Sequence, residues 1–229
     1  MRKSIFSLAL ACLLGSGSLA QASMMTSNVS HTLSKTDWTD TFAIAKFNTA
    51  LGTLTSIKFD LSGYTTGILK AESDNTVATN VTLILESLLK LTRADMTFLV
   101  DVDPFTQRMF SFTAYDGVDD FGGTSGASTG NITSAVVVDS YTSALAADLA
   151  SFSTSGSGTV NVLLEATGKS KATGSGNLTT KFTTNATADV AVTYIYTAAS
   201  TSIPEPESTS MLLGGLGLIG FMARRRKAT

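Results

Sequence analysis

The chain has 229 residues, of which 43% are hydrophobic and 15% are charged, and its formal net charge is −2. Without the basic residues of its two ends and the two acidic residues near Pro206, the body keeps 10 basic and 16 acidic residues. An acidic body excludes the basic surface with which most proteins bind nucleic acid. The lone Cys12 excludes disulfides within the chain, and the lone His31 removes most zinc sites and the usual Ser–His–acid triad.

The N-terminus has the layout of a secretory signal peptide. Residues 1–3 are positively charged, residues 5–14 are apolar, and Ala20 and Ala22 supply the small residues of a cleavage site. We expect export through the Sec translocon and cleavage by signal peptidase after Ala22. Lipidation at Cys12 is an alternative, but this residue lies inside the apolar segment.

The body is predicted to be all-β. Short β-branched and aromatic runs, separated by Gly, Asn, Asp and Ser, are typical of strands and turns. Period-two alternation and these boundaries predict strands over residues 41–47, 54–61, 77–91, 97–102, 109–115, 135–140, 158–166 and 188–196. About eight to ten evenly spaced strands favour a β-sandwich or jelly roll.

Several segments between these strands receive their own prediction. Gly63 ends one strand, and the Asp103-Pro104 pair supplies a turn. Three successive valines suit residues 135–140 to a central strand, and apolar side chains at helical spacing predict a short surface helix over residues 143–152. Two ambiguities remain: residues 87–91 form a strand or a helical turn, and residues 168–187 form a long hairpin or a poorly ordered loop.

The C-terminus combines three features in a fixed order. These are Pro204-Glu205-Pro206, the apolar run over residues 211–222, and the basic cluster Arg224-Arg225-Arg226-Lys227. The prolines interrupt regular structure, the apolar run favours lipid, and the basic cluster favours the cytoplasmic side of a membrane. A run of this length spans roughly 18 Å as a helix, against roughly 30 Å of hydrocarbon. We therefore expect a short transmembrane helix that serves as a removable handle.

Glycines recur every third residue in the apolar run, at Gly214, Gly217 and Gly220. They would give the helix one smooth face for close approach by another membrane helix. The alternative is a chance result of small-residue composition.

The three-part tail resembles the PEP-CTERM sorting signal of Gram-negative bacteria. The resemblance implies recognition by an exosortase, a membrane-embedded enzyme that cleaves near Pro204-Glu205-Pro206, in species that make extracellular polysaccharide. A plain tail anchor is the alternative.

The body resembles the choice-of-anchor E domain, through residues 46–57, the loop 116–126 and the closing residues 192–196. Asn48 stands where a typical member has Asp. The resemblance implies placement at the cell surface and supplies no activity. The predicted organisation is a signal peptide over 1–22, a β domain over 23–200 and a sorting signal over 201–229.

Two groups of acidic residues are candidate sites. Asp116, Asp119 and Asp120, in a Gly-rich loop, could supply oxygen ligands to Ca²⁺, although their spacing matches no known calcium loop and a solvated turn is the alternative. Asp101 and Asp103 share one strand face, where they could join that site or act as paired carboxylates of a glycosidase.

These observations predict an exported, non-enzymatic surface or matrix protein of a biofilm. We expect an inner-membrane intermediate with its β domain in the periplasm, release near the Pro-Glu-Pro tag, and association with extracellular polysaccharide. The alternatives are a Ca²⁺-dependent or carbohydrate-binding module and a carbohydrate-active hydrolase.

Overall fold

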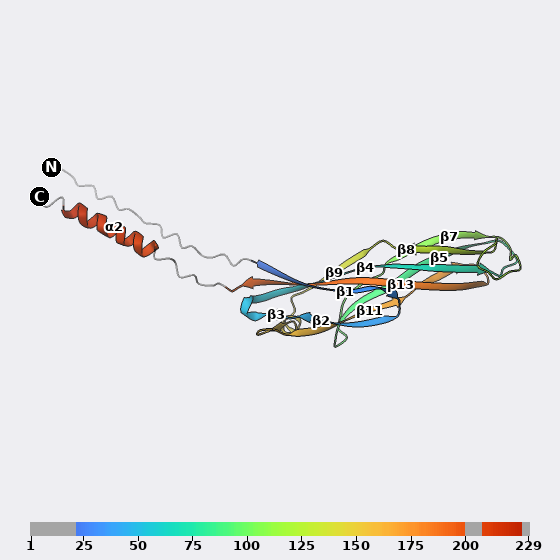
Figure 1. Cartoon of the computed structure of the whole chain (residues 1–229), viewed down its shortest axis with the longest axis horizontal. Helices are drawn as coiled ribbons and strands as arrows, with labels where there is room; N and C mark the ends of the chain where they lie inside the picture. The colour runs from blue at the N-terminus through green and yellow to red at the C-terminus, as the bar shows by residue number, and fades with distance from the viewer. Residues whose placement is uncertain (1–21, 200–207, 226–229) are drawn as a thin grey trace, which may run out of the picture. The chain divides into compact units, whose positions relative to one another are not determined.

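The computed structural model describes residues 22–199 and 208–225 (Figure 1). Residues 22–198 belong to one compact unit, here called the β domain, and the C-terminal helix α2 belongs to a second. The predicted signal helix lies outside the described residues. The elements in chain order are β1 (Ala22–Lys35), β2 (Trp38–Ala45), β3 (Phe47–Asn48), a 3₁₀ turn (Thr49–Leu51), β4 (Gly52–Ser73), β5 (Thr79–Arg93), β6 (Phe98–Val102), β7 (Phe105–Phe112), β8 (Gly126–Thr133), β9 (Val137–Ser143), α1 (Ala146–Ser151), β10 (Ser153–Thr154), β11 (Thr159–Gly168), β12 (Lys171–Gly174), β13 (Leu178–Ala198) and α2 (Ser208–Arg225).

The β domain is a sandwich of two sheets, which confirms the predicted all-β class with a short helix. The first sheet has the order β1-β13-β4, and both β8 and β9 pair with β4. In the second sheet, β5 pairs with β11, β12, β6 and β7, and β2 lies beyond β11. All of these pairings are antiparallel, as expected for sheets that hold one face to the core and the other to solvent.

Three long strands, β4, β5 and β13, run through the domain (Figure 1). Of the strands beside them, β1 is a single strand along part of β13, whereas the others are interrupted. The register shows that β6 and β7 are two parts of one strand, because Val102 lies opposite Leu89 and Phe105 lies opposite Glu86. The same holds for β11 with β12 along β5. Along β4, β8 and β9 also follow one another, but the register shifts by one residue between them, since Thr133 lies opposite Thr66 and Val137 lies opposite Gly63.

The breaks coincide with a narrow waist where the two sheets approach each other. Two glycines of β4 lie there, and a Cβ atom at either one would collide with a leucine of β5 and with a carbonyl oxygen of β13. Buried hydroxyl groups fill the waist and bond to one another or to main-chain groups freed at the breaks. The waist is defined by Gly63, Thr65, Gly67, Ser87, Ser134 and Thr184.

The waist separates two hydrophobic clusters. The larger one contains Phe47, Phe59, Phe152 and Tyr194, all with no exposed surface. The smaller one contains Leu69, Val81, Leu83, Leu85, Phe112 and Ile132. Burial of this apolar surface is the main stabilising contribution to the sandwich.

Four expectations about local structure need correction or completion. Gly63 lies inside β4 and does not end a strand. A glycine stands here because the close contact between the sheets leaves no room for a side chain. Asp103-Pro104 does not form a turn but interrupts an edge strand that continues in the same direction. A proline is tolerated at an edge because its missing N–H would face no neighbouring strand. Residues 87–91 form a strand. Residues 168–187 form neither a hairpin nor a loop, since β12 pairs with β5 and β13 pairs with β4.

The valine-rich strand is also placed differently from expectation. Within the described residues β9 pairs only with β4, so it lies at an edge, and Val136 and Val138 are more than 60% exposed. The apolar run indicated a strand correctly but not its position in the sheet.

The predicted short surface helix is confirmed as α1. Its Phe152 end packs into the larger cluster, and Asp148 accepts hydrogen bonds from Arg93 at 2.6 Å and from Ser143 at 2.5 Å. Asp148 is buried, and this charged network fastens α1 to the ends of β5 and β9.

We expect Gly63→Ala to lower the free energy of unfolding by about 1–3 kcal/mol, because the new methyl group must displace Leu89 and the main chain of β13. Urea denaturation of the full chain in detergent would measure the change. Ser62→Ala, one residue away on the outer face, is the matched control and should stay within about 0.5 kcal/mol of the parent. Equal urea midpoints for Gly63→Ala and the parent would contradict the claim that the sheets leave no room for a side chain at Gly63.

Candidate functional site

The C-terminal sorting segment is described over α2, while Pro204, Glu205, Pro206, Arg226 and Lys227 lie outside the described residues. Most of the apolar side chains described in α2 are exposed, with Leu213, Ile219 and Phe221 at about 70%. The Gly positions at three-residue intervals follow one side of this helix. Within 208–225 and the rest of the described chain, no helix is long and apolar enough to cross a membrane.

The two ends of the β domain's chain lie side by side. Ala22, the first described residue, pairs with Thr197 near the end of β13. The predicted cleavage after Ala22 therefore falls at the first residue of β1, and Ala20 lies outside the described residues. Removal of the signal peptide would leave the rest of the β1–β13 ladder in place.

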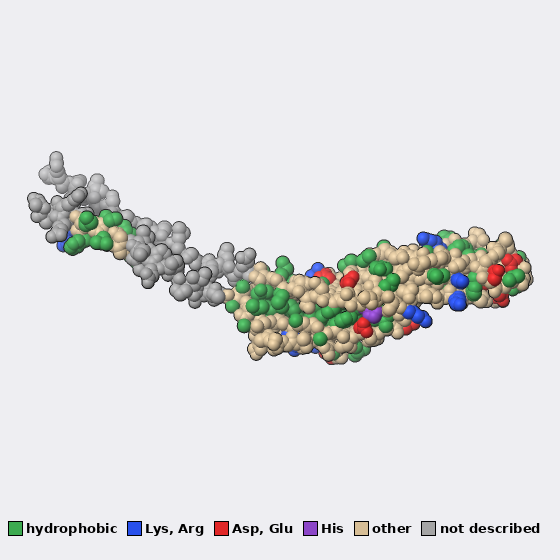
Figure 2. All heavy atoms as spheres, in the orientation of Figure 1, with side chains coloured by type: hydrophobic (Ala, Val, Ile, Leu, Met, Phe, Trp, Pro, Cys, Tyr) green, Lys and Arg blue, Asp and Glu red, His purple; other side chains and the backbone are tan. Residues whose placement is uncertain are grey.

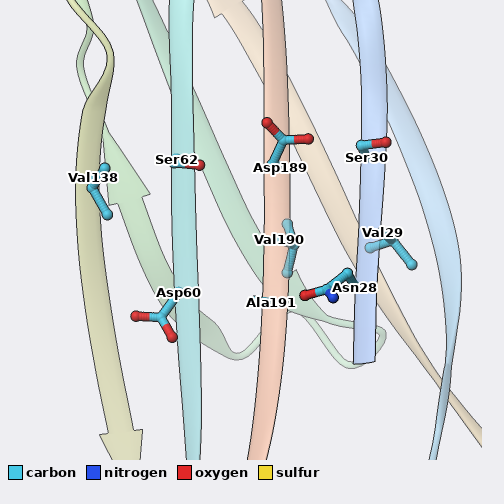
Figure 3. Close-up of a pocket in the computed structure, with 9 residues that line it drawn as sticks. All are labelled: Asn28, Val29, Ser30, Asp60, Ser62, Val138, Asp189, Val190 and Ala191. Atoms are coloured by element: carbon cyan, nitrogen blue, oxygen red, sulfur yellow. The ribbon is translucent and has the colours of Figure 1, made fainter. Parts of the chain in front are cut away.

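A shallow groove of about 330 Å³ crosses the outer face of the first sheet (Figure 3). Asn28 of β1, Asp189 of β13 and Asp60 of β4 place their polar groups along it, and Val138 of β9 lies at its far side. Lys58 forms an ion pair with Asp60 at 2.6 Å. The groove thus offers carboxylate, amide and hydroxyl groups, which can bond to a ligand that carries many hydroxyls.

The acidic loop is held by its own hydrogen bonds. The carboxylate of Asp116 accepts main-chain N–H groups of Val118 and Thr124, which hold the pKa of this carboxyl below its usual value. Asp119 accepts the hydroxyl of Tyr115 at 3.0 Å, and this bond raises the pKa of Tyr115 to about 12. Asp120 accepts the N–H of Gly122 at 2.7 Å. These contacts account for a stable turn, the alternative to a metal site.

The two acidic groups predicted from the sequence do not meet. Asp101 lies opposite Lys90 of β5, and Asp103 lies 3.5 Å from Lys169, near the waist. The loop 113–125 instead joins the ends of β7 and β8 and bonds to Asn75, beyond the other end of β5. Among the described residues no three His, Cys, Asp or Glu side chains are placed to hold a metal ion. A shared calcium or glycosidase site therefore lacks its geometric basis.

A cluster around His31 is a feature that the sequence analysis missed. His31 Nδ1 lies 2.5 Å from Asp40 Oδ2 and His31 Nε2 lies 2.7 Å from Ser34 Oγ, which is the hydrogen-bond order of a Ser–His–Asp triad. The argument that a lone histidine removes such an arrangement is wrong. The Trp38 ring stacks on the imidazole at 3.6 Å between centroids, and only 14% of the His31 side chain is exposed. The cluster joins β1 of one sheet to β2 of the other.

Comparisons with known proteins identify the tail. The model of the PEP-CTERM protein-sorting motif matches residues 202–227. This motif indicates an exported protein that an exosortase sorts to the cell surface. No curated protein matches the chain. The comparisons do not confirm the likeness of the body to the choice-of-anchor E domain, which stays a prediction.

Two solved viral structures resemble this chain distantly. Infectious bursal virus derived T=1 particles match with 11% identity over 79% of this chain and 36% of theirs, at a TM-score of 0.17. The infectious bursal disease virus VP2 subviral particle matches with 10% identity over 79% of this chain and 38% of its own, at a TM-score of 0.19. The chain thus spans less than two fifths of these viral chains, and such scores support no conclusion about its fold or function.

Proposed function

We propose that this chain is a non-enzymatic surface or extracellular-matrix protein, cut by an exosortase near Pro204-Glu205-Pro206 and associated with extracellular polysaccharide. The sorting motif over residues 202–227 is the observation that carries the proposal. The Sec translocon and signal peptidase act first, at the N-terminus. The chain then forms an inner-membrane intermediate with its β domain in the periplasm.

The dimensions of α2 support a transient membrane contact. Its 18 residues extend over about 27 Å as a helix, and the apolar part is shorter. A bilayer core of about 30 Å leaves such a segment poorly matched unless the bilayer thins or its arginines extend to the surface. A processing enzyme needs the segment only briefly, so a weak anchor is sufficient.

The sorting proposal predicts a C-terminus that depends on the enzyme. Expressed with an active exosortase, the mature chain should end near Pro206, and intact mass measurement should show the loss of the whole segment that follows the tag, through Thr229. Pro204→Ala combined with Pro206→Ala should retain the tail, while Glu207→Ala, just outside the tag, should be cut normally. An intact tail in strains with and without exosortase would refute cleavage.

The groove on the first sheet is the proposed contact for polysaccharide. Asp60 and Asp189 lie on neighbouring strands with their carboxylates at the surface, where they can accept hydrogen bonds from sugar hydroxyls. Bonds to charged groups contribute more than those between neutral groups.

Asp60→Ala combined with Asp189→Ala should weaken binding to extracellular polysaccharide purified from the producing strain by about tenfold or more, because two charged acceptors are lost. Cosedimentation over a range of polysaccharide concentrations measures the change. Asp139→Ala is the control, since Asp139 is exposed on neighbouring β9 and does not line the groove. Equal binding by the parent, the double variant and Asp139→Ala would exclude the groove as the polysaccharide-binding site.

The His31 cluster gives a test of the non-enzymatic role. If it only fastens β1 to β2, His31→Ala should lower the free energy of unfolding by about 1–2 kcal/mol, through the loss of two hydrogen bonds and the Trp38 stack. A fluorophosphonate probe should leave Ser34 unmodified in the full chain. Labelling that disappears in both Ser34→Ala and Asp40→Asn would show an activated nucleophile and contradict the proposal.

A further inference from the structure

Glu72 is a buried carboxylate without a partner. It lies near the end of β4, and its side chain has no exposed surface. Neither carboxylate oxygen has a hydrogen-bond partner among the described residues. A charged group in this position is costly unless something compensates for the lost water.

The Gly-rich loop closes directly over this carboxylate. Gly126 lies opposite Glu72 in the β4–β8 ladder, and a Cβ atom at Gly126 would collide with Oε2 of Glu72 and with the main-chain nitrogen of Gly122. That same nitrogen donates to Asp120. The carboxylates of Glu72 and Asp120 therefore approach one stretch of loop main chain, and the loop leaves room for Glu72 only because Gly stands at position 126.

The basic group closest in sequence does not compensate for Glu72. Lys70 lies two residues away on the same strand face, but its Nζ lies over the Phe121 ring, 5.8 Å from the centroid. Within residues 22–199 it forms no ion pair with Glu72. Acidic side chains gather at one end of the domain, so the surroundings add negative charge (Figure 2).

We propose that Glu72 binds a calcium ion beneath the loop 116–126, with Asp120 as the second carboxylate and main-chain carbonyl oxygens of the loop completing the shell. Calcium accepts carboxylates and carbonyls in irregular geometry, whereas magnesium keeps several waters, for which a closed site has little space. The calcium ligands predicted from the sequence were Asp116, Asp119 and Asp120. The proposed carboxylate ligands are instead Asp120 and Glu72 of β4. The site is independent of how the C-terminus is processed.

The test is thermal unfolding of the full chain in detergent, first stripped with EDTA and then titrated with calcium chloride. A ligand that binds only the folded state at about 100 times its Kd should raise the melting temperature by on the order of 5–10 °C. Magnesium chloride should raise it much less. Glu72→Gln should melt higher than the parent in EDTA, because a buried charge is removed, and should gain nothing from calcium.

Asp120→Asn, which keeps an acceptor for Gly122, should respond to calcium only at higher concentration. Glu86→Gln is the matched control, since Glu86 lies on β5 with Lys171 at 2.9 Å, and it should respond to calcium like the parent. A parent melting temperature that calcium does not change would overturn the proposal, as would an equal response by Glu72→Gln.

Discussion

The close approach of the two sheets at the waist constrains the rest of the β domain. Gly63 and Gly67 let β4 lie against β5 and β13 at a distance that no side chain would permit. Three flanking strands are interrupted beside this narrowing, at residues 103–104, 134–136 and 169–170. The freed main-chain groups must still be satisfied, because unpaired buried amides and carbonyls are costly. Hydroxyl side chains provide the partners, as when Ser134 accepts the N–H of Thr65.

This constraint gives a physical reason for part of the Ser and Thr content of the chain. A hydroxyl is small enough for the waist and can both donate and accept. The hydroxyls of Thr65 and Ser87 bond to each other and that of Thr184 bonds to Ser170, although almost none of their surface is exposed. Apolar residues of larger volume would force the sheets apart, and alanines would leave the breaks unsatisfied. The two hydrophobic clusters on either side then form one domain, since β4, β5 and β13 are continuous through the waist.

The sequence predicts the class of fold well because alternation reports which face of a strand is buried. Val81, Leu83 and Leu85 follow this rule and are buried as expected. Neither alternation nor an apolar run reports which strands are neighbours, so Val138 fits the pattern of a central strand although it lies on an edge. Glycine is ambiguous in the same way: Gly63 has the local signature of a turn, and only the opposing sheet shows that it permits a close contact.

Sites were harder to predict than strands because they depend on contacts between distant segments. Glu72 belongs to a polar patch in the sequence, and nothing nearby indicates that the loop 116–126 covers it. The His31 cluster is formed by residues close in sequence, but a bulge in β1 between His31 and Ser34 sets its geometry. The sorting motif can be predicted from the sequence alone, because its three features follow one another along the chain and do not depend on tertiary contacts.

The direction of the strands also separates the two functional ends of the β domain. Ala22 pairs with Thr197, so the signal peptide and the sorting tail both join the domain at one end of β13. The other end of β13 begins at Leu178, opposite Ser73 and next to Glu72 and the acidic loop. A strand of 21 residues extends over about 65–70 Å, so the loop lies that far from the point of attachment. Processing at the tail would therefore leave the acidic end and the groove unchanged, because every described strand pair ends before residue 199.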